Sequence, residues 1–327
     1  MFRIAASRVA IALVLAGCSG LAQKDPDPTP VSPTAVTETH VVNEGIKDFP
    51  TFESMTRTYT RANMQRSEST VSGAGIFARF PGSASANARI ERLDRNVVWT
   101  LDAKYRRYSE CPLQGCPAVI PRKPPEKQSA DGNKPRDAEC RLKIGTTTWA
   151  VERTGLKRSI NGFDTEQYDV KWLVTFRDNA SRNATGALSI DLWTTPVTPA
   201  LEGAMALEKS YARARDAVLG MANDSDKSLL LPIEVGRMLN SHLSQYVSPT
   251  DRSKFLAGAT KLDKVKGRPI LTNVTWRFAG GACAMEASMK EFGDKPRFTF
   301  TSEVMSYKLD SLHDSLFAPP RNYKRTK

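Results

Sequence analysis

Few residues in this chain of 327 could carry covalent or metal chemistry. It contains five cysteines and only three histidines, His40, His242 and His313. His40 lies in a proline-rich N-terminal stretch, His242 on a predicted helix and His313 in a polar segment near the C-terminus, so the sequence does not bring them together. No spacing typical of a serine hydrolase, a zinc protease or a phosphate-binding loop occurs. We therefore expect no enzyme, no cofactor and no metal site, and the cysteines are the residues to interpret.

The first cysteine, Cys18, ends a segment that is typical of a secretion signal. Arg3 and Arg8 precede an unbroken apolar run over residues 9–16, which is too short to span a bilayer permanently. Residues 15–18 (LAGC) resemble the bacterial lipobox, in which small residues precede a lipidated cysteine. By this resemblance residues 1–17 are a signal peptide and Cys18 becomes the first mature residue, acylated on its sulfur and its amino group. The alternatives are an ordinary signal peptide with a chance cysteine and a buried N-terminal helix.

Acylation would place the protein at a membrane surface. Each buried CH₂ of an acyl chain contributes ~0.8 kcal/mol, and several chains make an anchor stable. Ser19 follows the cysteine, and by resemblance to lipoprotein sorting rules the absence of aspartate there favours the bacterial outer membrane. We expect the protein to face the periplasm, with exposure at the cell surface left open. Residues 18–45 are rich in proline and lack aromatics, which predicts a disordered tether.

The other four cysteines suggest disulfides. In an oxidising compartment Cys111, Cys116, Cys140 and Cys283 would form two bridges, for which three connectivities exist. Either Cys111–Cys116 or Cys111–Cys140 would close a proline-rich, basic insert at residues 111–140. Zinc is the rival interpretation, but these spacings lack the paired ligands that zinc sites use.

From residue 46 to residue 327 the pattern is that of one folded domain. Strand patterns occur at residues 88–101, 147–153, 166–176, 187–194, 269–278 and 297–309. Apolar residues recur at three- and four-residue intervals over 201–219 and 229–247, which predicts two helices, and 255–262 gives a third, shorter one. Runs of strands with segregated helices predict an α+β fold: a curved antiparallel β-sheet, or half-barrel, with two or three helices packed on one face.

Aromatic residues are concentrated in the predicted strands. They have two interpretations, as core of the sheet or as the lining of an apolar ligand cavity. The candidate cavity-lining residues are Trp99, Trp149, Tyr168, Trp172, Trp193 and Trp276.

Several short motifs resemble one known group of proteins. They are the segment 94–101 followed by Tyr108-Ser109-Glu110, the segment 158–164 followed by Tyr168-Asp169-Val170, the strand end at 192–196, and residues 316–320 with Tyr323. In this order they resemble uncharacterised bacterial periplasmic proteins grouped with the lipoprotein carriers (LolA/LolB-like). That resemblance implies a curved sheet around helices with an apolar concave cavity and carries over no catalytic residue. The cysteine-containing insert has no counterpart in that pattern.

These observations lead to a functional expectation. Lys and Arg exceed Asp and Glu by 47 to 35, a net charge of +12. The compartment argues against nucleic acid, whereas anionic headgroups or polysaccharide would suit this charge, and a solvated surface is the default. We expect a membrane-anchored lipoprotein that binds an amphipathic or lipid-like ligand in a concave apolar sheet. The alternatives are an accessory subunit that docks on an envelope protein through the basic insert and, less favoured, a hydrolase.

Substitution of the proposed lipidation site tests the anchor. Cys18→Ser removes the thiol that the acyl chain needs, so we expect processing, radiolabelled fatty-acid incorporation and membrane fractionation all to be lost in bacterial cells. The control Ser19→Ala keeps the thiol and should be processed and labelled like the parent chain. An unchanged Cys18→Ser variant would contradict the lipoprotein prediction.

Overall fold

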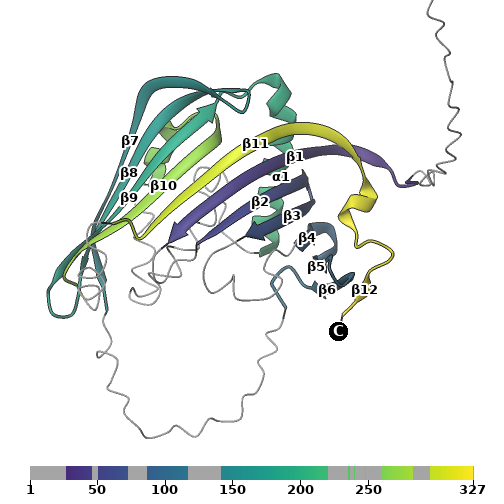
Figure 1. Ribbon diagram of the computed structural model, residues 1–327, viewed down its shortest axis with the longest axis horizontal. Helices are drawn as coiled ribbons and strands as arrows, with labels where there is room; N and C mark the ends of the chain where they lie inside the picture. The colour runs from purple at the N-terminus through teal and green to yellow at the C-terminus, as the bar shows by residue number, and fades with distance from the viewer. Residues whose placement is uncertain are drawn as a thin grey trace, which may run out of the picture.

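The computed structural model of the chain describes residues 27–45, 51–72, 87–116, 141–219, 259–282 and 295–326, together with the single positions Val235, Leu239 and Val247. Within these ranges the protein is built on one sheet of twelve strands, which is open at both edges and bends around a helix (Figure 1). Its spatial order is β12-β6-β5-β4-β3-β2-β1-β11-β10-β9-β8-β7. The strands are β1 (Val31–Gly45), β2 (Phe52–Arg61), β3 (Met64–Ser72), β4 (Asn87–Arg92), β5 (Val97–Asp102), β6 (Arg107–Cys111), β7 (Lys143–Ile160), β8 (Phe163–Arg177), β9 (Asn183–Thr195), β10 (Arg268–Gly280), β11 (Phe298–His313) and β12 (Lys324–Arg325).

Local sequence signals explain many of these elements. The predicted turn between β7 and β8 is confirmed: Asn161 and Gly162 have φ of 50° and 81°, the left-handed conformation that a two-residue hairpin needs. The predicted strand pair at 88–101 is confirmed as β4 and β5. A single turn of 3-10 helix, η2 (Leu93–Arg95), joins them and is followed by Asn96 at φ 50°.

The α-helix of the described residues, α1 (Pro199–Leu219), confirms the prediction at 201–219. Its first backbone amides, those of Leu201 and Glu202, donate to the carbonyl of Thr198. Pro199 suits the first turn because its missing amide would have no partner there. The helix packs on β1, β2 and β11. Leu201 and Ala204 are buried in one cluster with Ala35 of β1 and Val304 of β11, whereas Tyr211 is buried in another with Leu93 and Val98. We call the sheet face that carries α1 the inner face and the opposite face the outer face.

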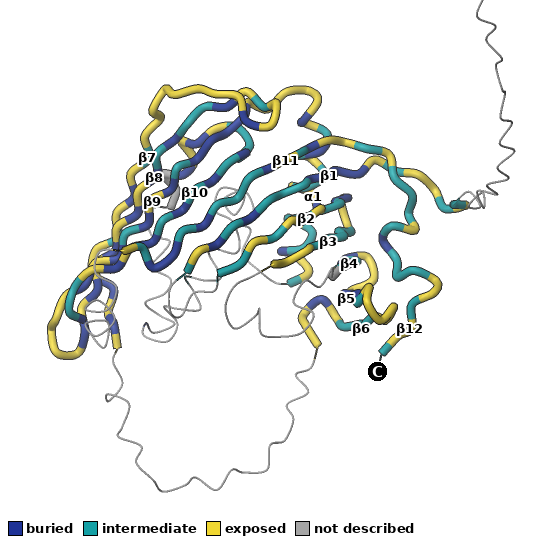
Figure 2. Tube along the Cα trace, in the orientation of Figure 1, coloured by how far each residue is buried: buried dark blue, intermediate teal, exposed yellow. Residues whose placement is uncertain are grey.

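The inner face of β7 to β10 holds the largest core. On β8 every second side chain from Tyr168 to Phe176 is buried, as the alternation predicts, while the intervening residues face outwards (Figure 2). Trp149, Trp172 and Trp276 stack in sequence, with ring centroids 5.4 Å apart for the first pair and 5.8 Å for the second. The helical residues Val235 and Leu239 pack against this core.

The tether prediction is wrong for residues 31–45, which form β1 near the middle of the sheet. The prediction gave the prolines of this segment more weight than its β-branched residues. In the structure Ala35, Val36 and Val41 of the segment are buried. Pro33 is tolerated because residues 31–34 pair with β11 only and pairing with β2 begins at Ala35, so its missing amide faces a locally unpaired edge. Residues 18–26 lie outside the described residues.

The α+β prediction is also wrong, because the protein is predominantly β. Strands of 13 to 18 residues make up β1, β7, β8, β9, β10 and β11. The sheet is mixed, since β12 pairs in parallel with β6. The described ranges contain one α-helix where two or three helices were expected. The predicted helix at 229–247 lies almost wholly outside them, and residues 259–264 form a 3-10 helix, η4 (Ala259–Lys264).

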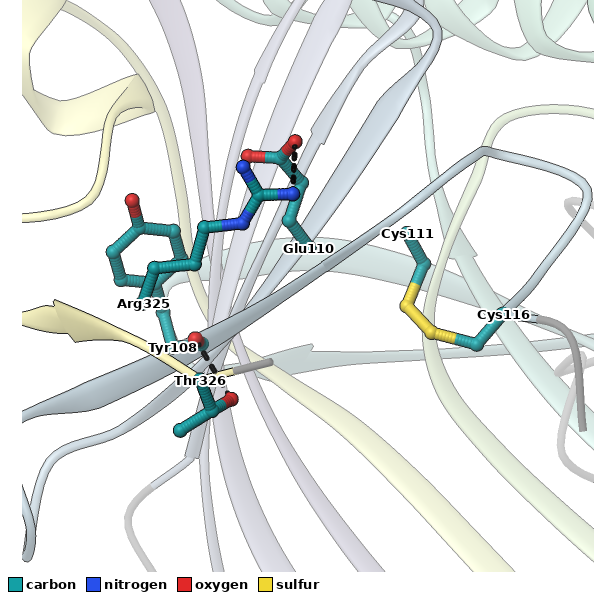
Figure 3. The surroundings of a disulfide bond; sticks show 6 residues. All are labelled: Tyr108, Glu110, Cys111, Cys116, Arg325 and Thr326. Atoms are coloured by element: carbon teal, nitrogen blue, oxygen red, sulfur yellow. Dashed lines mark hydrogen bonds and ion pairs between the residues drawn. A yellow bond between two sulfur atoms is a disulfide. The ribbon is translucent and has the colours of Figure 1, made fainter. Parts of the chain in front are cut away.

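One cysteine pair lies within the described residues. Cys111, the last residue of β6, and Cys116 are joined by a disulfide with a Cα–Cα distance of 4.9 Å (Figure 3). This is one of the two pairings that the sequence favoured for Cys111. Cys140 and Cys283, as well as Cys18, lie outside the described residues.

A glycine beneath the tryptophan stack offers a test of this core. A Cβ on Gly186 of β9 would lie 2.3 Å from the Trp276 ring, closer than any real contact. We expect Gly186→Ala to lower the free energy of unfolding by about 1–3 kcal/mol through overpacking, measured by urea denaturation. Gly281→Ala, whose Cβ would meet nothing within 4 Å, is the matched control and should change stability little. Equal stability of the two variants would contradict the described packing.

Candidate functional site

A large groove lined by described residues lies between α1 and the inner face of the sheet. Its volume is about 1060 Å³, near the upper end for small-molecule sites in proteins. Strands β1, β2, β3, β4, β10 and β11 form one wall, while α1, η4 and the segment that follows η4 form the other. We call it the inner groove.

Hydroxyl groups line the sheet wall of the inner groove. Every second residue of β2 from Ser54 to Thr60 is Ser or Thr, and this period of two places all four hydroxyls on one face. The register continues the pattern sideways, because Thr58 lies opposite Thr37 of β1 and Ser67 of β3. A ladder of hydroxyls therefore crosses three strands.

Only part of this ladder is used within the protein. Thr56 and Ser69 hydroxyls lie 2.9 Å apart, and Gln65 donates to Thr60 at 3.1 Å. In the part of the chain that the structure describes, four groove hydroxyls on β1, β2 and β3 have no protein hydrogen bond: those of Thr39, Ser54, Thr58 and Ser67. These groups are available to a ligand or to water.

The far end of the inner groove is apolar. Val41 of β1 and Phe52 of β2 meet Leu262 and Val265 there, and these residues belong to or pack against the tryptophan core. The groove therefore changes from a hydroxyl lining over β2 and β3 to apolar side chains beside η4, where Asp263 and Lys266 also belong to the lining. It is amphipathic, in contrast to the uniformly apolar concave face that the sequence predicted.

One carboxylate of α1, Glu208, holds the helix to the sheet beside the groove. It accepts hydrogen bonds from Thr37 at 3.1 Å and Tyr307 at 3.0 Å and forms an ion pair with Arg268. The Arg268 guanidinium also lies 3.7 Å from the centroid of the Tyr307 ring. Burial raises the pKa of Tyr307 above its usual range, and the Glu208 charge adds to this, so the phenol stays protonated as a donor.

A second carboxylate, Glu91 of β4, fixes the other half of the helix. It accepts hydrogen bonds from Tyr211 at 2.6 Å, Arg89 at 2.8 Å and Arg215 at 3.2 Å. Burial alone would raise the pKa of Glu91. The Tyr211 and Arg89 hydrogen bonds and the two arginine charges outweigh burial, so its pKa lies below the usual 4.5. Burial and the Glu91 charge together raise the pKa of Tyr211.

Asp216 of α1 differs from these two carboxylates. It lines the inner groove and is 9% exposed. Among the described residues it has neither a hydrogen bond nor an ion pair. Within the described part of the chain the groove therefore presents two carboxylates without an ion-pair partner, those of Asp216 and Asp263.

The six aromatic residues that the sequence proposed as cavity lining are core residues. Tyr168, Trp149, Trp172 and Trp276 share the tryptophan core, Trp193 packs beneath the start of α1, and Trp99 lies under the C-terminal segment. Within the described part of the chain none of them lines the inner groove. Sequence reasoning missed the groove residues, whose signal was the Ser/Thr alternation of β2.

The chain has no match among the family models or the curated proteins. No group of three or more His, Cys, Asp or Glu side chains in the described ranges could hold a metal ion. In those ranges no helix combines the length and the apolar character needed to cross a membrane.

The Glu91 network predicts a dependence of stability on pH. Because folding lowers the pKa of Glu91, the unfolded chain binds this proton more readily than the folded protein does. The Glu91 network therefore contributes its full stabilisation of the fold above about pH 4.5, and this stabilisation is lost as pH falls through the folded pKa. We expect Glu91→Gln to lose stability at neutral pH and to flatten the decline below pH 4.5, measured by denaturant titration at several pH values. Glu202→Gln, which changes an exposed carboxylate on α1, is the control. An acid decline in Glu91→Gln as steep as in the parent chain would refute the assignment.

Proposed function

We propose that this protein is a membrane-anchored lipoprotein that binds an amphipathic ligand in the inner groove without transforming it. The observation that carries the proposal is the change in lining along the groove, from free hydroxyls over β2 and β3 to apolar side chains beside η4. A ligand with one polar and one apolar end would satisfy both linings, whereas a wholly apolar ligand would leave the hydroxyls without partners.

The polar end of the groove indicates the type of head group. Thr39, Ser54, Thr58 and Ser67 offer hydroxyls that both donate and accept hydrogen bonds. Asp216 adds an acceptor that carries charge. Lys209 and Lys266 also line the groove and form no salt bridge within the described residues. A zwitterionic head group, with both an ammonium and a phosphate, therefore fits this set best.

The apolar end supplies the hydrophobic part of the affinity. Val41, Phe52, Leu262 and Val265 provide aliphatic and aromatic surface there. Covering apolar surface contributes roughly 25 cal/mol per Å². One hydrocarbon chain laid along this end would therefore contribute more to binding than any single hydroxyl contact.

The anchor is the second part of the proposal. Cys18 precedes the first described residue, Asp27, by nine positions (27 − 18). Acyl chains on that cysteine would hold the groove close to the bilayer from which an amphipathic ligand could be drawn.

A bulky side chain placed in the groove tests the ligand site. The probe is lysophosphatidylethanolamine with a fluorophore on its single acyl chain. Its head group carries both an ammonium and a phosphate, and it has one hydrocarbon tail. We expect saturable binding to the full-length protein and at least about tenfold weaker binding to Thr58→Trp, which fills the hydroxyl-lined section. Fluorescence titration measures both constants.

Ser189→Trp is the matched control, since Ser189 is an exposed strand hydroxyl on the outer face of β9. It should bind the probe like the parent chain. Equal binding by all three proteins, or no saturable binding by the parent, would refute a ligand site in the inner groove.

A further inference from the structure

A cluster of basic residues lies where the hairpin tip between β5 and β6 meets the C-terminal strand β12. The pairing of β12 with β6 places Lys324 opposite Arg107 and Arg325 opposite Tyr108. Backbone amides of Lys324 and Thr326 donate to the carbonyls of Arg106 and Tyr108 at 3.0 and 2.8 Å, and Figure 3 shows this junction beside the disulfide. We call its cations the basic corner: Lys104, Arg106, Arg107, Arg321, Lys324 and Arg325.

The charge of the basic corner is only partly neutralised. Arg107 lies 4.0 Å from Asp102 and Arg325 lies 3.0 Å from Glu110, so six cations meet two carboxylates and a charge of +4 remains (6 − 2). The other four cations are exposed and form no salt bridge within the described ranges. Like charges opposite each other in a sheet are destabilising, as for Lys324 and Arg107, so an external anion would relieve a cost that the fold itself leaves in place.

The hairpin tip carries two further features of a binding surface. Tyr105 is 57% exposed, and its ring centroid lies 5.2 Å from the Lys104 ammonium and 4.7 Å from the Arg107 guanidinium. Tyrosine flanked by cations is typical of side chains that sit at a membrane–water interface. Arg106 has φ of 49°, a conformation that favours glycine or asparagine, and retaining arginine there points to a use for its charge.

The basic corner is linked to the point where the N-terminal segment enters the fold. Asp27 accepts hydrogen bonds from Thr29 and Ser315, and the Asp314 amide donates to the Pro30 carbonyl at 2.9 Å. Ser315 belongs to η5 (Asp314–Phe317), from which the chain continues to β12. Phe317 packs with Tyr108 and Tyr323 in one core cluster, so η5, β6 and the C-terminal segment form a single packed unit.

Chain lengths restrict where a membrane could lie. Asp27 follows Cys18 by nine positions, and Lys324 follows Ser315 by nine positions (324 − 315). Each stretch spans at most about 30 Å. An acylated Cys18 would therefore keep the edge of the sheet that carries η5 and β12 near the bilayer.

We propose that the basic corner is a membrane-docking surface that binds the anionic phospholipid head groups of the bilayer that holds the anchor. The Lys and Arg side chains contact phosphates while Tyr105 enters the interface. Docking would orient the inner groove relative to the bilayer. The surface shares no residue with the groove, so its loss leaves ligand binding intact.

Vesicle binding of the full chain tests this surface. All proteins in this experiment carry Cys18→Ser, so that acyl chains do not attach them to the vesicles. The vesicles are made of neutral phosphatidylcholine, with or without about 30% of the anionic lipid phosphatidylglycerol. We expect at least tenfold tighter binding to the anionic vesicles, reversed by about 1 M salt, in co-sedimentation. Neutralising two cations, Arg106→Gln with Lys324→Gln, should weaken binding to the anionic vesicles roughly 30-fold.

The matched control removes two exposed lysines from the opposite edge of the sheet. Lys143→Gln with Lys157→Gln on β7 makes the same charge change and should weaken binding less than about threefold. Equal binding to neutral and anionic vesicles, or equal losses in the two double variants, would overturn the proposal. Tight binding to a single-stranded oligonucleotide without vesicle binding would overturn it in favour of a soluble polyanion. Groove binding of the lysolipid probe, measured on the same variants, separates this outcome from failure of the ligand site.

Discussion

The pairing of β1 with β11 is the constraint on which the rest of this structure depends. It joins Val31–Gly45 to Phe298–His313, near the two ends of the chain, along their whole length. On one side of this pair stand β2 to β6 and β12, and on the other stand β10, β9, β8 and β7. Without the pairing there would be two smaller sheets, each with an additional exposed edge. It requires contacts across most of the chain, which are costly to form before neighbouring strands are in place.

The helix α1 gives this long sheet its site. Glu208 of α1 accepts from donors on β1, β10 and β11, and Glu91 of β4 accepts from Tyr211 and Arg215 of α1. Both carboxylates have several partners, and together they fasten the helix over the inner face. The same helix carries Asp216, which has no such partners among the described residues. Charges that hold the structure are thus separate from those left for a ligand. The inner groove lies between α1 and the hydroxyl ladder, and these side-chain bridges fix the helix along it.

The two ends of the sheet also have different roles. At β7 to β10 the inner face is filled by stacked tryptophans and serves stability. At β12 and β6 an excess of cations lies exposed beside the disulfide between Cys111 and Cys116. A sheet of this length keeps such regions apart, so core, groove and surface charge can each be altered with little effect on the others.

Local features of the chain were readable from its sequence because they depend on near neighbours. Asn161-Gly162 specifies a hairpin through its backbone conformation, the alternation from Tyr168 to Phe176 specifies a half-buried strand, and residues 201–219 specify an amphipathic helix. The position of β1 in the sheet could not be predicted from the sequence, because a segment with Pro33 and several threonines becomes a central strand only when β2 and β11 flank it. The groove and the basic corner were hidden for the same reason. Each is assembled from residues hundreds of positions apart, and only the pairing of distant strands decides which side chains meet.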